Sequence, residues 1–184
     1  MAMPPVTASA VALMLAMMSS PAVHSKTDSP SPRVYGWVEE GLLLPEKAAL
    51  KIKLDTGALT SSMDAKDLER FEKDGEHWVR FNVEVKDSKS AKTVSIPFER
   101  RVERNVKVRG AGGEERRPVV KLKMCIGDRI YNEEFSLKNR GKMIYPVLIG
   151  RRTLEHLGAV DVSRTFTVEP KCNGDSSGKQ ANKS

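Results

Sequence analysis

Short segments of alternating apolar and polar residues run through most of this chain, and they restrict its fold more than any other feature. A period of two is typical of β-strands that bury one face. Helical spacing is clear at 151–157, where Leu154 and Leu157 share a face and Gly158 follows as a stop. We therefore expect an all-β fold, a closed β-barrel of about 140 residues with one short C-terminal helix. The expected strands are 34–38, 49–54, 78–85, 93–98, 102–108, 119–126, 129–137, 145–149 and 160–168.

Two further segments interrupt this pattern near the start of the domain. Residues 39–47 are predicted to form a turn. Residues 61–71 contain Met63, Leu68 and Phe71 at spacings compatible with a short helix, which Ser62 would cap.

The first 25 residues are predicted to be a signal peptide. They contain no Lys, Arg, Asp or Glu, and residues 11–18 form an apolar run too short to span a bilayer. Small residues at 20–25 offer a cleavage site, although no basic residue precedes the apolar run, and a disordered leader is the alternative. We expect a periplasmic or secreted protein with no stable membrane anchor. The predicted organisation is a signal peptide at 1–25, a Ser/Pro-rich linker at 26–33, a folded domain at 34–170 and a disordered tail at 171–184.

Composition argues against nucleic acid as a partner. The net charge of the 184-residue chain is +7, which by itself is compatible with an anionic ligand. The basic residues are scattered, however, and aromatic residues make up only 5% of the chain. Basic residues interleaved with aromatic ones, which bind and stack bases, are absent from the sequence.

The cysteines and histidines do not suggest a metal site. Cys125 and Cys172 are the only cysteines, and they lack the C-x-x-C spacing of zinc ligands. They could form a disulfide in an oxidising compartment, but the sequence leaves this open because it does not give their separation. His24, His77 and His156 do not form a His-Glu-x-x-His motif. The glycine-rich segment at 110–113 is not followed by Gly-Lys-Ser/Thr, so it is not a phosphate-binding loop. From these observations together we expect no metal and no cofactor.

Asp55-Thr56-Gly57-Ala58 is the candidate for chemistry. It directly follows the strand expected at 49–54, so its carboxylate would stand at a strand end in a tight turn. A single Asp-Thr-Gly triplet has a simpler explanation as an ordinary turn, because Asp and Gly are turn residues. Its place in the order of motifs gives it more weight. A hairpin tip, Gly110-Ala111-Gly112-Gly113, follows it, and then the apolar run Val147-Leu148-Ile149-Gly150-Arg151 leads into the short helix.

This order resembles one lobe of a retropepsin. With Arg116-Arg117-Pro118-Val119-Val120 included, the motifs are similar to those of the bacterial retropepsin-like aspartic peptidases formerly labelled ATP-dependent zinc proteases. The resemblance covers about residues 34–168.

The resemblance implies an aspartic endopeptidase that cuts peptide or protein substrates. Because the chain has one Asp-Thr-Gly triplet, the second carboxylate would come from Asp55 of another copy in a homodimer. Thr56 would hold the paired loops together, and Gly57 would allow the close turn. Ala58 has no hydroxyl to donate to the carboxylate, so we expect a pKa above that of a Ser-containing relative and activity nearer neutral pH.

Two other parts of the site follow from the same resemblance. Residues 110–113 would be a flap, with an ordinary flexible hairpin as the alternative. Ile149, Gly150 and Arg151 would form the second signature. Relatives pair this Arg with an Asp at the place of Leu59, so that ion pair is not expected here, and Arg151 is otherwise a solvated helix start.

Two rival functions remain open at this point. One is a non-catalytic periplasmic peptide-binding or regulatory module of the same fold, in which the two Asp55 carboxylates never meet. The other is a basic domain that binds an anionic polymer, whose affinity would fall steeply with salt.

Overall fold

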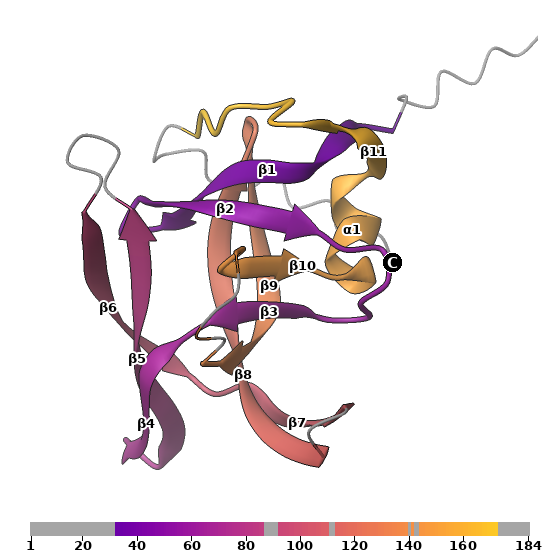
Figure 1. Ribbon diagram of the computed structural model, residues 1–184. Helices are drawn as coiled ribbons and strands as arrows, with labels where there is room; N and C mark the ends of the chain where they lie inside the picture. The colour runs from indigo at the N-terminus through magenta and orange to yellow at the C-terminus, as the bar shows by residue number, and fades with distance from the viewer. Residues whose placement is uncertain (1–31, 87–91, 111–112, 140, 142–143, 173–184) are drawn as a thin grey trace, which may run out of the picture. The chain divides into compact units, whose positions relative to one another are not determined.

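The computed structural model describes residues 32–86, 92–110, 113–139, 141 and 144–172, so the predicted signal peptide and most of the linker lie outside it. The described residues are mostly β-strand, with a short helix before the last strand (Figure 1). The elements are β1 Val34–Leu44, β2 Ala48–Leu54, β3 Ser61–Asp64, β4 Lys66–Lys73, β5 Glu76–Lys86, β6 Thr93–Arg101, β7 Arg104–Gly110, β8 Gly113–Ile126, β9 Arg129–Lys138, β10 Val147–Ile149, α1 Arg151–Leu157 and β11 Ala159–Thr165.

The large sheet closes on itself as a barrel. Its strand order is β11-β1-β2-β10-β3-β9-β8-β7, and the last three residues of β1 also pair with β8. This extra pairing joins β1, β2, β10, β3, β9 and β8 into a closed six-stranded barrel, with β11 and β7 as extensions. The predicted all-β fold, a closed barrel with a short C-terminal helix, is therefore confirmed.

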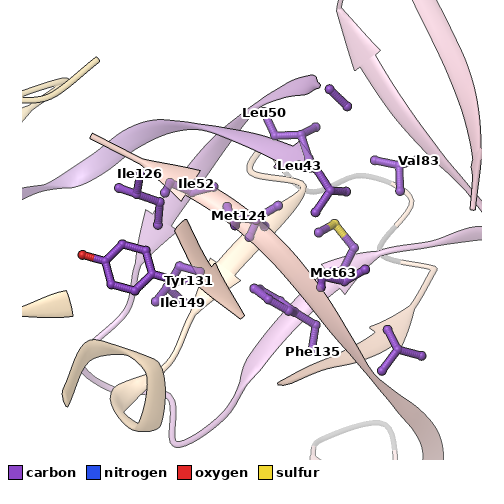
Figure 2. Close-up of a cluster of buried hydrophobic side chains, with 14 of the residues drawn as sticks. Leu43, Leu50, Ile52, Met63, Val83, Met124, Ile126, Tyr131, Phe135 and Ile149 are labelled. Carbon is purple, nitrogen blue, oxygen red and sulfur yellow. The ribbon is translucent and has the colours of Figure 1, made fainter. Parts of the chain in front are cut away.

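Alternate residues of the barrel strands fill its interior. In β2, Ala48, Leu50, Ile52 and Leu54 are buried, while the residues between them face the other side of the sheet. Side chains from β1, β2, β3, β8 and β9 point toward one another in the core (Figure 2). Burial of each large apolar side chain stabilises the fold by about 1.5–3 kcal/mol.

The predicted turn at 39–47 is wrong over most of its length. β1 continues through Glu39 to Leu44, and only residues 45–47 turn. Glu39, inside the predicted turn, is completely buried. Its carboxylate accepts hydrogen bonds from the backbone N–H groups of Gly36 (2.6 Å), Thr167 (3.0 Å) and Val168 (3.2 Å) and from the Thr167 hydroxyl. A buried carboxylate with this many donors can occupy a strand.

The helix predicted at 61–71 is also wrong, because these residues form β3 and β4. Leu68 and Phe71 are three residues apart, which imitates a helical repeat. The register of β4 against β5 shifts between Lys66 and Glu69, and Asp67 there has φ 49°. This bulge breaks the period of two, so the spacing of apolar residues in β4 does not reveal a strand.

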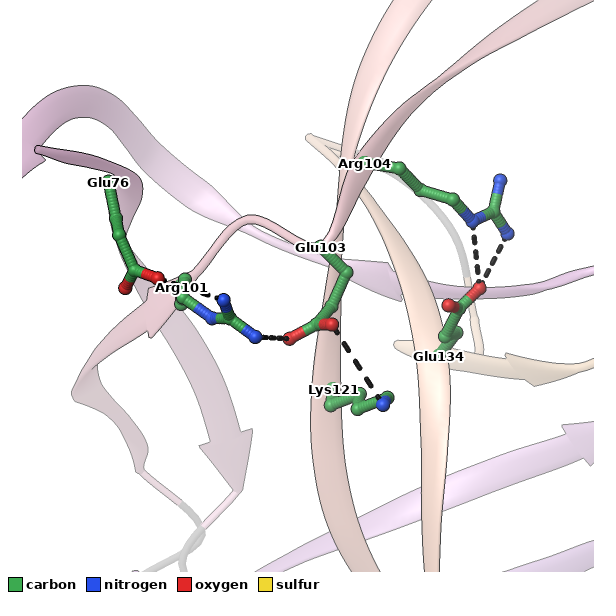
Figure 3. Close-up of polar contacts among 6 residues, drawn as sticks. All are labelled: Glu76, Arg101, Glu103, Arg104, Lys121 and Glu134. Atoms are coloured by element: carbon green, nitrogen blue, oxygen red, sulfur yellow. Dashed lines mark hydrogen bonds and ion pairs between the residues drawn. The ribbon is translucent and has the colours of Figure 1, made fainter.

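A second sheet, of order β4-β5-β6, connects to the barrel beside the start of β7. Charged side chains line this junction (Figure 3). Arg101 pairs with Glu76 (3.0 Å) and Glu103 (3.3 Å), and next to them Arg104 pairs with Glu134 of β9. These contacts hold the base of the β7–β8 hairpin against its neighbours, although each exposed pair contributes little by itself.

The segment after β11 is tied back to the barrel. Cys125 and Cys172 form a disulfide with a Cα–Cα distance of 6.0 Å, which resolves the alternative that the sequence left open. The N–H of Lys171 donates to the carbonyl of Gly127 (2.7 Å). The predicted disordered tail therefore starts too early, since residues 171 and 172 are anchored, and residues 173–184 lie outside the described part. We call residues 166–172 the C-terminal strap.

Candidate active site

The Asp-Thr-Gly-Ala loop and the second signature are neighbours because β10 pairs with β2 in parallel. Ile149 lies opposite Leu54, and the N–H of Asp55 donates to the carbonyl of Ile149 (2.8 Å). The two motifs, far apart in sequence, therefore meet where both strands end. Figure 1 shows β10 beside β2, with α1 following directly.

The Asp55 carboxylate is oriented by its own loop and by a lysine. The N–H of Gly57 donates to Oδ1 (3.0 Å), and Lys53 Nζ lies 3.3 Å from Oδ2. The Asp55 side chain is 24% exposed, which leaves the carboxylate accessible. A Cβ at residue 57 would lie 3.2 Å from Oδ1, so glycine gives the carboxylate room.

The pKa of Asp55 reflects opposing influences. Partial burial raises the pKa, whereas the Gly57 N–H bond and the Lys53 ammonium lower it, and the net pKa lies below the ordinary value. From the missing hydroxyl of Ala58 we expected a pKa above that of a Ser-containing relative, and that expectation concerned the paired carboxylates. It omitted Lys53, which supplies the side-chain donor that Ala58 lacks.

Arg151 braces the loop from the start of α1. Its Nη1 donates to the carbonyls of Thr56 and Gly57, each at 3.0 Å. Its backbone N–H also donates to the carbonyl of Ala58 (2.9 Å). Leu59 has no carboxylate to pair with Arg151, and Arg151 binds the loop carbonyls instead. It is therefore more than a solvated residue at the start of a helix.

Sequence reasoning missed a buried hydroxyl pair behind the loop. Ser61 Oγ accepts a hydrogen bond from the N–H of Gly150 (3.0 Å) and lies 2.8 Å from Thr153 Oγ1. These bonds fix the segment after the loop to the start of α1. The only sequence signal was the run of hydroxyl residues at 60–62, which has no periodicity that would identify partners.

The predicted flap region is the end of the β7–β8 hairpin. Gly110 pairs with Gly113, and Gly113 has φ 98°, which glycine adopts readily. Ala111 and Gly112 lie outside the described residues. Arg109 pairs with Glu114 along the hairpin (3.2 Å), so its arms carry charge up to the tip.

A small cavity of about 160 Å³ lies next to the segment that follows the loop, and no residue of the loop itself lines it. Its walls come from the segment after the loop, the base of the hairpin, β9 and the start of α1. The lining residues are Thr60, Ser61, Arg104, Val106, Val119, Asn132, Glu133, Glu134, Ser136, Arg152 and Thr153.

Neither a metal cluster nor a membrane-spanning helix is found among the described residues. His156 pairs with Glu133 (2.8 Å), and no three His, Cys, Asp or Glu side chains gather in that part of the chain in a way that would hold a metal ion. In the same residues, α1 is far too short to cross a bilayer, and no longer apolar helix is present.

The closed barrel, with an Asp-Thr-Gly-Ala loop beside a Leu-Ile-Gly-Arg segment, defines a retropepsin-like domain. The family model described as retropepsin-like aspartic endopeptidase RimB matches residues 34–171, and the chain belongs to this RimB-like family.

Curated relatives that match this chain are named as probable alpha-L-glutamate ligases and not as peptidases. The chain is 31% identical over 124 residues to a probable alpha-L-glutamate ligase of Shewanella pealeana, covering 67% of this chain and 27% of that protein. It is 34% identical over 115 residues to one of Parasynechococcus marenigrum, covering 62% of this chain and 24% of that protein. The chain thus spans about a quarter of the length of these curated relatives.

A solved structure is similar to the whole domain. It is a protein of unknown function from Legionella pneumophila, with a TM-score of 0.64 and 34% identity. The match covers 76% of this chain and all of that chain.

Proposed function

We propose that the protein is an aspartic endopeptidase whose site is completed by two copies of the chain. The observation that carries this proposal is the Asp55 carboxylate, which stands at the end of β2, remains 24% exposed and is oriented by the Gly57 N–H. One carboxylate cannot act as both general base and general acid in a single step. A twofold axis near Asp55 would supply the second.

The chemistry follows from the two carboxylates. Two such groups close together share one proton, because both cannot ionise cheaply. The ionised Asp55 takes a proton from a water molecule between the pair, while the protonated Asp55 donates to the scissile carbonyl oxygen. The water oxygen adds to the carbonyl carbon, and the tetrahedral intermediate then breaks into an amine and a carboxylic acid. No covalent bond to the protein forms.

The surroundings of Asp55 suit the general base. In the single chain the Asp55 pKa lies below its ordinary value, so the carboxylate is ionised at neutral pH. The approach of a second Asp55 would raise the pKa of one member of the pair, which then carries the shared proton. Arg151 keeps the loop in place through the Thr56 and Gly57 carbonyls.

The names of the curated relatives bear on the substrate and not on the reaction. This chain matches about a quarter of those proteins, so we do not extend ligase activity to it. A domain of this kind within a glutamate ligase suggests that the peptides it cuts contain glutamate. The net charge of +7 supports an acidic substrate.

The alternative is a non-catalytic peptide-binding or regulatory module of the same fold. The oligomeric state separates the two functions, because a lone Asp55 lacks its partner. A chain that stays monomeric at high concentration with peptide present would favour the module.

Asp55→Asn tests the proposal directly. The variant keeps the size of the side chain but cannot act as a base, so we expect kcat/KM on a diverse peptide library to fall roughly 10³-fold or more. Asp74→Asn, in the β4–β5 turn at φ 54°, is the matched control and should cleave normally. Cleavage that survives Asp55→Asn would contradict the proposal, and loss of wild-type cleavage with a chelator would point to a metal.

We also propose that the protein works in the periplasm or is secreted. The Cys125–Cys172 disulfide supports this location, since disulfides persist in oxidising compartments and are rare in the cytosol. We expect the full chain to appear in the periplasmic or extracellular fraction with a new N-terminus after Ala22 or Ser25. Cytoplasmic protein that retains residues 1–25 would contradict this expectation, which N-terminal sequencing of each fraction measures.

A further inference from the structure

Lys53 shares a face of β2 with the Asp55 loop. The buried positions of β2 are Ala48, Leu50, Ile52 and Leu54, so Lys51 and Lys53 face the opposite side. Lys53 is the nearer of the two, with Nζ 3.3 Å from Asp55 Oδ2. Its side chain is 38% exposed, so the ammonium group is also open to a bound molecule.

One partly accessible aliphatic side chain lies beside this ammonium group. Lys53 is in register with Leu148 of β10, which is half-buried and keeps part of its aliphatic side chain accessible. Its other register partner, Val38 of β1, is buried and offers no surface to a ligand. Leu148 precedes Ile149, whose carbonyl accepts the Asp55 N–H. A substrate residue at the scissile bond would therefore meet an aliphatic surface and a cation together.

The charges of a completed site do not balance without a substrate anion. In the single chain, one Lys53 pairs with one Asp55. In the proposed dimer, two Lys53 ammonium groups face a pair of carboxylates that shares one proton and carries one negative charge. One positive charge is left over beside a site from which peptide binding excludes water, and such a charge favours an anionic partner.

We propose that Lys53 is a specificity-determining residue that selects an acidic side chain, Asp or Glu, next to the scissile bond. This inference rests on the proposed function and assigns its substrate preference to one residue. The methylene groups of a glutamate would lie along Leu148, and its carboxylate would accept hydrogen bonds from Lys53 Nζ. A charge-assisted pair of this kind is stronger than a neutral hydrogen bond, and a glutamine in its place would leave the ammonium group uncompensated.

Peptides that differ in one residue test the selection. We would use the full chain with acetylated, amidated peptides that carry Glu, Gln or Lys beside a common scissile bond, so that only a side chain supplies a carboxylate. We expect wild type to prefer the Glu peptide over the Gln peptide by about 10- to 100-fold in kcat/KM, mainly through KM. Lys53→Met should reduce this ratio at least tenfold, Lys53→Gln should do the same, and Lys53→Arg should retain most of it.

Lys51→Met is the matched control. Lys51 also faces away from the core of β2, but its Nζ lies over the ring of Phe166 at 5.8 Å and not beside Asp55. The Glu-to-Gln ratio of this variant should equal that of wild type.

Four results would overturn the proposal. If Lys53→Met slows both peptides equally and leaves the ratio unchanged, Lys53 acts only through Asp55. If wild type shows the preference only with a free C-terminal carboxylate, the selected group is a chain end and not a side chain. If wild type cleaves no peptide in an Asp55-dependent manner, the proposed function fails and this inference with it, whereas cleavage without acidic preference removes this inference alone.

Discussion

Glu39→Ala is expected to lower the free energy of unfolding by about 3–5 kcal/mol. Glu39 is fully buried, and its carboxylate accepts from three backbone N–H groups and the Thr167 hydroxyl. Removing the carboxylate leaves these donors without an acceptor, and each buried orphan costs about 1–3 kcal/mol. Three of the donors belong to the C-terminal strap, so the strap should detach from β1 before the barrel unfolds. Urea unfolding measures the loss, and hydrogen exchange locates it.

The neighbouring Glu40 provides the control for this measurement. It is exposed on the same strand, and Glu40→Ala should change the free energy of unfolding by less than about 0.5 kcal/mol. If Glu39→Ala is as mild as Glu40→Ala, the hydrogen bonds to Glu39 do not hold the strap.

Gly150→Ala should damage both stability and the proposed activity. A Cβ at residue 150 would lie 2.5 Å from the carbonyl carbon of Thr60 and 2.8 Å from its nitrogen. These are backbone atoms, so no side-chain rotation relieves the overlap. We expect a loss of about 3 kcal/mol in the free energy of unfolding, because the segment after the Asp55 loop must move away from α1. Asp55-dependent cleavage should fall with it.

Gly75→Ala is the control for Gly150→Ala. It measures the loss of stability from replacing a glycine where the new Cβ overlaps no other atom. Gly75 has φ 75°, and no heavy atom lies within 4 Å of the place that a Cβ would take, so only backbone strain of about 1–2 kcal/mol is expected. Urea unfolding of both variants compares them. Equal losses would show that residues 60 and 150 are not tightly packed in solution.

The fold was predictable where strands keep a strict period of two. β2 and β5 alternate almost without interruption, and both were expected within a few residues of their observed ends. β4 was missed because a bulge at Asp67 changes its period. The second half of β1 was missed because a buried glutamate looks like a surface residue until its donors, which lie at the far end of the chain, are known.

The site was predictable in its motifs but not in its contacts. The Asp55 loop and the Ile149–Arg151 segment were both identified, and the parallel pairing of β2 with β10 brings them together. The bonds from Arg151 to loop carbonyls carry no sequence signal, since every residue has a carbonyl. Lys53 did carry a sequence signal, because side chains two positions apart along an extended backbone project to the same side, and Asp55 directly follows β2.

The pairing of β1 has a consequence for the time course of folding. β1 pairs with β2 soon after it in the chain, with β8 much later, and with β11 near the end. During synthesis β1 therefore emerges from the ribosome long before its partners β8 and β11. The barrel can close only after most of the chain has emerged, and such non-local closure is slow. Until then its apolar face and edges stay uncovered, which is the interval when a chaperone would matter most.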